Sequence, residues 1–154
     1  MSDKPHIFVA SDHAGFALKD ELKTFLELLG YTTTDCGADT LQEDDDYPDF
    51  IARAAEAISK HPGGARAIVI GKSGQGEAIV ANRYVSVRAA VYYGGDVSVV
   101  SLSREHNDAN ILSLGAGFLS LEEAKEAVKI FLETSFSGDE RHIRRIEKIE
   151  HLHS

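Results

Sequence analysis

Apolar and amphipathic stretches alternate regularly along this chain. Five short runs rich in β-branched residues predict buried strands, over residues 6–10, 31–35, 65–70, 87–92 and 111–114. The stretches between and after them carry apolar residues at helical spacing and predict helices over residues 16–29, 48–60, 78–83, 96–104, 120–133 and from 140 onward. This alternation predicts an α/β fold, a doubly wound, Rossmann-like, five-stranded parallel sheet with helices on both faces.

Helix ends and buried faces follow from the same pattern. Gly30 ends the first helix, Pro48 begins the second, and Ser120 forms a capping box with Glu123. The predicted inward positions are Leu18, Leu22, Phe25, Leu26 and Leu29, then Ile51, Ala54, Ala55 and Ile58, and then Leu121, Ala124, Val128, Phe131 and Leu132. The C-terminal helix carries Ile143, Ile146 and Ile149 as an apolar set, together with arginines.

Composition narrows the class of protein. With 154 residues, 43% of them apolar, we expect one domain over residues 1–154 with a single core. No run approaches the roughly 20 apolar residues of a membrane span, and the polar N-terminus predicts no signal peptide. The single cysteine, Cys36, cannot form an internal disulfide, so we expect a cytoplasmic protein with no membrane partner. The net charge of −9 argues against nucleic acid as a partner.

A glycine-rich turn, Gly71 to Glu77, follows the central strand and leads into a helix. Unpaired N–H groups at a helix start suit an anion, and the helix dipole favours an ionised carboxylate at Glu77. The turn does not match a phosphate-binding P-loop, because Arg66 stands where that motif needs glycine. Gln75 likewise breaks the nucleophile-elbow pattern, and the glycine spacing differs from the dinucleotide fingerprint. An ordinary strand-to-helix turn stays open as the alternative.

Polar turns are expected at the carboxyl ends of the strands, where ligands bind in such sheets. We predict three there, over residues 11–13, 71–77 and 106–108. Each has a structural alternative: Asp12 caps a helix, His13 and His106 face solvent, and Asn107, Asp108 and Asn110 cap a turn. The acidic run at residues 44–46 is interpreted as a solvated surface. Convergence of the three turns at one edge favours a functional site.

The C-terminal helix concentrates positive charge in an acidic protein, through Arg141, Arg144, Arg145 and Lys148. Arg141 and Arg145 are one turn apart on one face, and two guanidinium groups at that spacing suit a phosphate dianion. The alternative is a solvated basic face whose partners are Glu140, Glu147 and Glu150.

These segments, in order and spacing, resemble the ribose-5-phosphate isomerase B family, which includes galactose-6-phosphate isomerase subunits. The matching residues are 11–16, 46–48, 71–77 with 81–82, 103–108 and 138–145. The resemblance implies an aldose–ketose isomerase of carbohydrate metabolism, in the pentose phosphate pathway, that converts ribose 5-phosphate to ribulose 5-phosphate through an enediolate without metal or cofactor. It also implies a homodimer, or a dimer of dimers, with active sites shared across the interface.

The resemblance also implies roles for single residues. One branch of the family uses a cysteine base, which corresponds to Gly71 here, and the other a glutamate where Glu77 stands, so this chain resembles the glutamate branch. Ser73 and the amides of Gly74, Gln75 and Gly76 would hold the enediolate oxygen, and Asp12 and His106 would assist ring opening. Asn107 would bind sugar hydroxyls, Tyr47 would contact substrate, and His13 with the partner subunit's Arg141 and the partner subunit's Arg145 would hold the phosphate.

One departure from the family pattern bears on the substrate. Family members commonly have an arginine where this chain has Gly117, and Lys72 is a candidate replacement. An isomerase of a six-carbon sugar phosphate, such as allose or galactose 6-phosphate, and a non-catalytic sugar-phosphate binding module therefore stay open. A flavodoxin-like receiver is disfavoured, because Gly71 occupies the place of its acidic phospho-acceptor.

Overall fold

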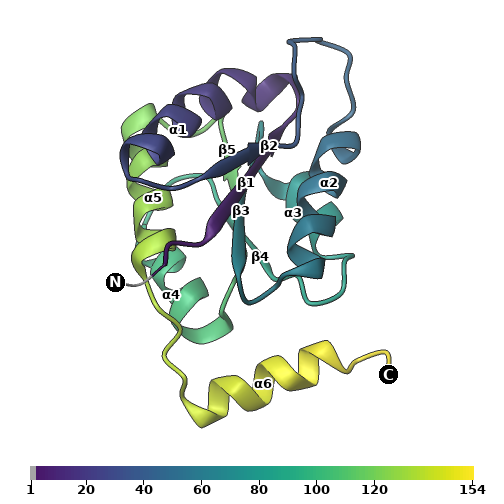
Figure 1. The fold of residues 1–154 in the computed structure, drawn as a ribbon, viewed down its shortest axis with the longest axis vertical. Helices are drawn as coiled ribbons and strands as arrows, with labels where there is room; N and C mark the ends of the chain where they lie inside the picture. Colours follow the sequence, from purple (N-terminus) through teal and green to yellow (C-terminus); the bar gives the residue numbers. More distant parts are fainter. Residues whose placement is uncertain (1–2) are drawn as a thin grey trace.

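The central layer is a five-stranded parallel sheet, as the sequence predicts (Figure 1). The computed structural model describes residues 3–154. The strands are β1 (His6–Ser11), β2 (Thr33–Asp35), β3 (Ala65–Gly71), β4 (Ala89–Tyr92) and β5 (Ile111–Gly115), in the order β2-β1-β3-β5-β4. All four neighbouring pairs are parallel. The chain proceeds outward from β1 to β2 and then crosses to β3 on the other side, so β1 and β3 form a topological switch point.

Helices cover both faces of this sheet (Figure 1). They are α1 (Phe16–Leu28), α2 (Tyr47–Lys60), α3 (Gln75–Ala81), α4 (Ser98–Asn107), α5 (Leu121–Glu133) and α6 (Glu140–Glu150), with a short 3-10 turn η1 (His13–Gly15) before α1. The first face packs on α1, α4 and α5, and the second on α2 and α3. Alternate residues of β3 point to opposite faces of the sheet. Ile68 and Ile70 belong to the hydrophobic cluster on the first face, and Ala67 and Val69 belong to the cluster on the second.

Several of the helix signals read from the sequence are confirmed, but α4 is shifted from the expected 96–104 and includes His106 and Asn107. The inward set of α2, Ile51 to Ile58, is fully buried. Ser120 and Glu123 form the capping box, with the Glu123 N–H donating to Ser120 Oγ at 3.1 Å and the Ser120 N–H donating to Glu123 Oε1 at 2.9 Å. The helix after the glycine turn begins at Gln75, earlier than the sequence pattern indicated. None of the helices within residues 3–154 is long and apolar enough to cross a membrane.

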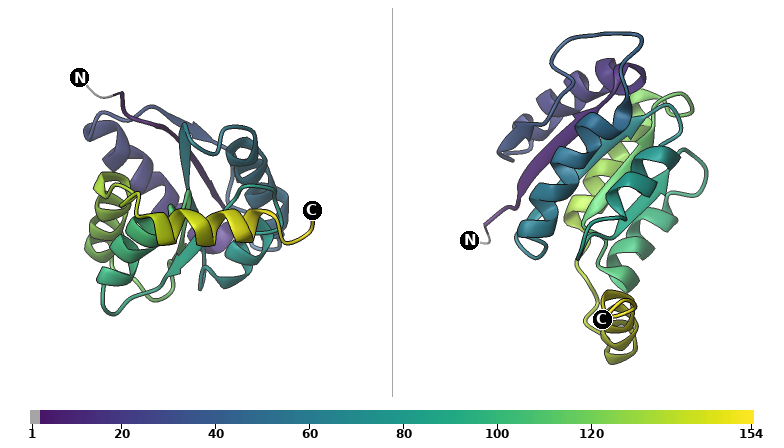
Figure 2. Two further views of the ribbon diagram at one scale, coloured as in Figure 1. Left: turned by 90° about the horizontal axis from the view of Figure 1, so that it is seen from below. Right: turned by 90° about the vertical axis from the view of Figure 1, so that its right-hand side faces the viewer.

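The C-terminal helix α6 lies outside the three layers, beneath the amino ends of the strands (Figures 1 and 2). An ion pair attaches it to the body, with Arg88 Nη1 2.6 Å from Glu150 Oε1. Its apolar set stays largely uncovered, because Ile143 and Ile149 are 41% and 49% exposed. The helix therefore presents both its isoleucines and its arginines to the outside of this chain.

Candidate active site

The switch point brings the first two predicted turns together. Ser11 of β1 is in register with Ile70 of β3, so Asp12 and Gly71, which follow them, are neighbours at the carboxyl edge of the sheet. Asp12 is 6% exposed and caps η1, accepting the Ala14 N–H at 3.1 Å. Asp12 is therefore a capping residue, which the sequence allowed as an alternative. This capping contact also holds its carboxylate at the carboxyl edge of the sheet.

Glycines let the turn after β3 close tightly around side chains. A Cβ on Gly71 would overlap the carboxylate of Glu77, so the absence of a side chain there makes room for that group. A Cβ on Gly76 would come within 2.6 Å of the Tyr47 ring, which packs against the start of α3. Strand β5 supports the turn, because Ser113 Oγ donates to the Gly74 carbonyl at 2.6 Å.

Glu77 is a buried carboxylate in the first turn of α3, with 4% of the residue exposed. Burial raises its pKa above the ordinary value of 4.5, and the charge of Asp12 raises it further. Backbone N–H groups of Glu77 and Gly74 act in the opposite direction, but the net pKa shift is upward. The N–H groups at the helix start therefore favour ionisation of Glu77, as the sequence indicated, but burial outweighs them. A carboxylate with a raised pKa beside backbone donors is suited to proton transfer at carbon.

His13 is bound at the same edge by a residue that the sequence did not single out. Asp45 Oδ1 accepts the His13 N–H at 3.0 Å and lies 2.6 Å from His13 Nδ1. The hydrogen bond to Asp45 is the main cause of a raised pKa at His13. The solvated reading of residues 44–46 is right for Asp44 and Asp46, which are exposed, and wrong for Asp45, whose side chain is 9% exposed.

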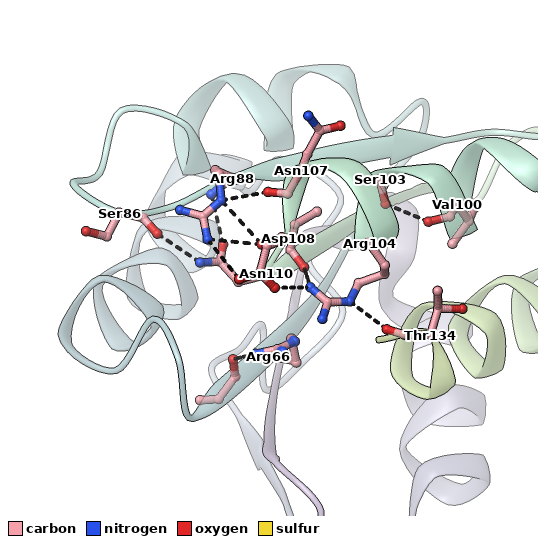
Figure 3. Close-up of polar contacts among 12 residues, drawn as sticks. Arg66, Ser86, Arg88, Val100, Ser103, Arg104, Asn107, Asp108, Asn110 and Thr134 are labelled. Atoms are coloured by element: carbon pink, nitrogen blue, oxygen red, sulfur yellow. Dashed lines mark hydrogen bonds and ion pairs between the residues drawn. The ribbon is translucent and has the colours of Figure 1, made fainter. Parts of the chain in front are cut away.

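The third predicted turn lies at the opposite edge of the sheet. Helix α4 leaves the carboxyl end of β4 and carries the chain back, so His106 and Asn107 end up beside the amino ends of β4 and β5. Figure 3 shows Asn107 there, with the Arg88 Nε donating to its carbonyl at 2.9 Å. The prediction that residues 106–108 share an edge with Asp12 and Glu77 is therefore wrong within one chain.

A network of hydrogen bonds around the buried Arg104 holds this amino edge together (Figure 3). Arg104, 4% exposed, pairs with Asp108 at 2.8 Å and donates to the carbonyls of Ala109 and Thr134 at 2.6 and 3.1 Å. Asp108 itself adopts a left-handed conformation with φ of 46° at the end of α4. These contacts set the position of the last turn of α4, and therefore of His106 and Asn107.

Two imidazole rings stack between α4 and α6. The ring centroids of His106 and His142 are 4.3 Å apart with an interplanar angle of 17°. His142 is 5% exposed, and burial together with the neighbouring His106 lowers its pKa below 6.5. His142 could not be singled out from the sequence, because only its arginine neighbours are typical of phosphate binding.

The candidate residues thus form two groups at opposite edges. The carboxyl-edge group contains Asp12, His13, Tyr47, Ser73, Gly74, Gln75, Gly76 and Glu77, and the amino-edge group contains His106, Asn107, Arg141 and Arg145. Strand β3 has seven residues, so the edges are about 20 Å apart at ~3.3 Å per residue. Arg141 and Arg145 are exposed. One chain therefore contains both groups, but they lie too far apart to form a single site.

One cluster within residues 3–154 has the ligand types of a metal site, namely Asp12, His13 and Asp45, whose ligand atoms lie within 4.8 Å of one another. Its closest pair, His13 Nδ1 and Asp45 Oδ1, has the geometry of a hydrogen bond. A hydrogen bond within the chain therefore accounts for this contact.

Comparison with known proteins gives a consistent family assignment. The model of the family described as Ribose/Galactose Isomerase matches residues 7–149. The chain is 39% identical over 141 residues to ribose-5-phosphate isomerase B of Mycolicibacterium paratuberculosis, covering 92% of this chain and 87% of that protein.

Solved structures agree with this result. Ribose-5-phosphate isomerase B from Mycoplasma genitalium, with bound ribulose-5-phosphate, superposes with a TM-score of 0.91 at 34% identity, covering 96% of this chain and 95% of that one. The enzyme from Clostridium thermocellum gives a TM-score of 0.88 at 41% identity, with 96% of each chain covered.

Proposed function

This chain belongs to the ribose/galactose isomerase family, and from that premise we propose that it interconverts ribose 5-phosphate and ribulose 5-phosphate. It is an aldose–ketose isomerase, as its relatives named ribose-5-phosphate isomerase B are. The observation that supports the proposal most directly is Glu77, a buried carboxylate with a raised pKa beside Asp12 and a turn of backbone donors. A sugar-phosphate binding module has no use for such a base.

The proposed reaction begins with the sugar ring. Asp12 and His106 assist opening, in which the O1 hydroxyl loses its proton and the ring oxygen gains one. Glu77 then removes the proton from C2 of the open aldose, and the electron pair moves to O1 as the enediolate forms. Ser73 and the amides of the Gly74–Glu77 turn stabilise that oxygen, a contribution worth about 10²–10³-fold per well-placed donor. Glu77 returns the proton to C1 while the O2 proton passes to O1, which gives the ketose.

The complete site is proposed to form between two copies of the chain. The two groups lie at opposite edges, about 20 Å apart, beyond the reach of any side chain. A second copy would supply its His106 and Asn107 for the sugar and its Arg141 and Arg145 for the phosphate, against His13 of the first. The uncovered Ile143 and Ile149 of α6 and the exposed Ile79 of α3 support such an association. Assembly into a dimer, or into a dimer of dimers, is part of the proposal.

The substrate and compartment belong to the proposal as well. Gly117 lies against Lys72, since a Cβ there would meet Lys72 Cγ at 3.1 Å, so Lys72 is placed to supply a cation that position 117 lacks. We propose ribose 5-phosphate over allose or galactose 6-phosphate because the relatives with similar sequences are named for ribose. The cytoplasm is the proposed location, since the single cysteine cannot form an internal disulfide.

The test is a ketose-coupled assay with ribose 5-phosphate, allose 6-phosphate and galactose 6-phosphate. The proposal predicts the highest kcat/KM for ribose 5-phosphate, and exchange of the C2 proton with D₂O during turnover. Binding of ribose 5-phosphate without ketose formation or C2 exchange would favour the non-catalytic module instead. A higher kcat/KM for a six-carbon sugar phosphate would support the isomerase reaction but contradict ribose 5-phosphate as the substrate.

A further inference from the structure

Asp45 approaches the site from a loop that runs from β2 to α2 across the carboxyl edge (Figure 1). The loop is attached to β1 at its start, where the Ser11 N–H donates to the Gly37 carbonyl at 2.9 Å and the Ala38 N–H donates to the Ser11 carbonyl at 2.7 Å. It then passes through exposed residues and turns inward again at Asp45. Asp45 is therefore placed by tertiary structure, 32 residues away from its partner His13.

One oxygen of Asp45 binds His13 at two points. Oδ1 accepts the backbone N–H at 3.0 Å and lies 2.6 Å from Nδ1 of the ring. A contact to both backbone and ring fixes the orientation of the imidazole as well as its place. It also commits Nδ1 to Asp45, which leaves Nε2 as the ring nitrogen for a ligand. The His13 side chain is 36% exposed, so part of the ring is open to one.

The charges around His13 favour its cationic form. The acidic groups that face it are Asp45 and Glu43 from the loop and Asp12 from the end of β1, and all three raise its pKa while burial opposes them. Asp12 Oδ2 lies 3.9 Å from Nδ1. A phosphate dianion would be repelled by these carboxylates unless the imidazole carries a proton. Asp45 in turn needs the cation, because its Oδ2 is buried without a hydrogen-bond partner among residues 3–154.

We propose that Asp45 is a positioning residue of the isomerase, which holds the His13 ring by Nδ1 so that Nε2–H is presented to the phosphate of the substrate. The inference rests on the proposed function, in which His13 contacts that phosphate. Asp45 does not touch the substrate in this scheme, and it acts through the imidazole alone. A purely structural role, anchoring the loop to η1, makes different predictions for pH dependence and for the coupling of the two residues.

The experiment compares Asp45→Asn with Asp44→Asn, which removes the same charge from the adjacent exposed residue. For Asp45→Asn we expect KM for ribose 5-phosphate to rise about tenfold at pH 7.5, with kcat changed less than about twofold, the size expected for one charge-assisted contact. The rise in KM with pH should begin at lower pH than in the wild type. The His13 Cε1 proton should titrate at lower pH by NMR, and Asp44→Asn should change none of these quantities.

A double-mutant cycle with His13→Gln separates positioning from loop anchoring. If Asp45 acts through His13, adding Asp45→Asn to His13→Gln raises KM no further. An equal rise in KM in both backgrounds overturns the proposal, as does an Asp45→Asn protein with wild-type KM and wild-type His13 titration. Thermal unfolding of each variant identifies loss of the folded state.

A measurement on the wild type keeps the test open if Asp45→Asn does not fold. Inorganic phosphate is titrated into ¹⁵N-labelled protein, and the two ring nitrogens of His13 are followed. We expect Nε2 to shift with phosphate while Nδ1 keeps the shift of a protonated, hydrogen-bonded nitrogen. A response at Nδ1, or at neither nitrogen, overturns the inference. Because these readouts need no turnover, they are independent of the failure or success of the isomerase assay.

Discussion

Replacing Glu77 by glutamine removes the proposed base with almost no change of shape. The carboxylate lies in the space that Gly71 leaves free, and the amide of glutamine fits the same volume. A positioned general base contributes about 10²–10⁴-fold, so we expect kcat for ribose 5-phosphate to fall about 10³-fold. KM should change by less than about threefold, because the groups assigned to the phosphate, His13, Arg141 and Arg145, are untouched.

The same substitution should raise stability. An acid whose pKa is raised in the folded state destabilises the fold once it ionises, so stability falls as pH rises from 4.5 through the folded pKa. Each unit of such a shift corresponds to about 1.4 kcal/mol. Glutamine cannot ionise, so Glu77→Gln should have a higher Tm at pH 7.5 and a flatter pH dependence of stability. Loss of activity together with gain of stability is the signature of a group kept for function.

The assay for Glu77→Gln combines three measurements: ketose formation, C2 proton exchange in D₂O, and Tm between pH 4 and pH 8. Glu56→Gln is the matched control, because Glu56 is an exposed carboxylate on α2 that pairs with Lys60 at the surface, and it should leave all three unchanged. If Glu77→Gln retains more than about a tenth of the wild-type kcat, Glu77 is not the base. Loss of ketose formation with full C2 exchange would also refute the reasoning, since proton abstraction would then proceed without it.

Three further predictions test the rest of the site. Mixing inactive Glu77→Gln and inactive His106→Asn chains should restore about a quarter of wild-type activity. Half of the dimers formed are hybrids, and each hybrid has one intact site of two. No recovery after subunit exchange would mean that both residues act in a site formed by one chain. Arg141→Ala should raise KM about 10–100-fold for ribose 5-phosphate and leave KM for ribose unchanged. Lys129→Ala, at an exposed position on α5, is the charge control. Equal effects on both sugars would show that Arg141 does not bind the phosphate. The pKa of His142 is lowered, so its contribution to stability is present above pH 6.5 and is lost as pH falls through the folded pKa. Denaturant unfolding between pH 7 and pH 5 should therefore show a smaller loss of unfolding free energy for His142→Gln than for the wild type. An identical loss would contradict the burial argument.

The fold was predictable because the spacing of apolar residues along the sequence reflects which faces of each helix and strand are buried. A strand buried on both faces is a continuous apolar run, as in β3, and a helix with one buried face repeats every three to four residues, as in α2. The carboxyl-edge group was predictable for the same reason, since Asp12 directly follows the buried strand β1 and Gly71 ends the buried strand β3. The helix boundary at Gln75 was not, because it depends on contacts of the glycine turn with Ser113 of β5.

The location of His106 and Asn107 was misjudged for a reason that topology explains. A polar turn that follows a helix and precedes a strand lies at the amino edge of a parallel sheet, since the crossover helix has already returned the chain. That rule could have been applied to α4 and β5 from sequence alone. Asp45 is different, because an acidic run gives no sign of which of its members turns inward. Likewise, the raised pKa of Glu77 reflects burial, which only the packed structure determines.

The division into two edges also accounts for how an acidic chain could bind a dianion. The carboxyl edge contains Glu77 as the proposed base, with Asp12, Glu43 and Asp45 nearby, and these last three carboxylates raise the pKa of the His13 imidazole that lies among them. Such a surface repels phosphate at long range, so we expect one chain alone to bind the substrate weakly. Arg141 and Arg145 lie on the opposite edge, on a helix attached through the Arg88–Glu150 pair. Bringing them to Glu77 from a second copy would add the missing positive charge only where a complete site forms, so phosphate affinity and catalytic competence would arise together.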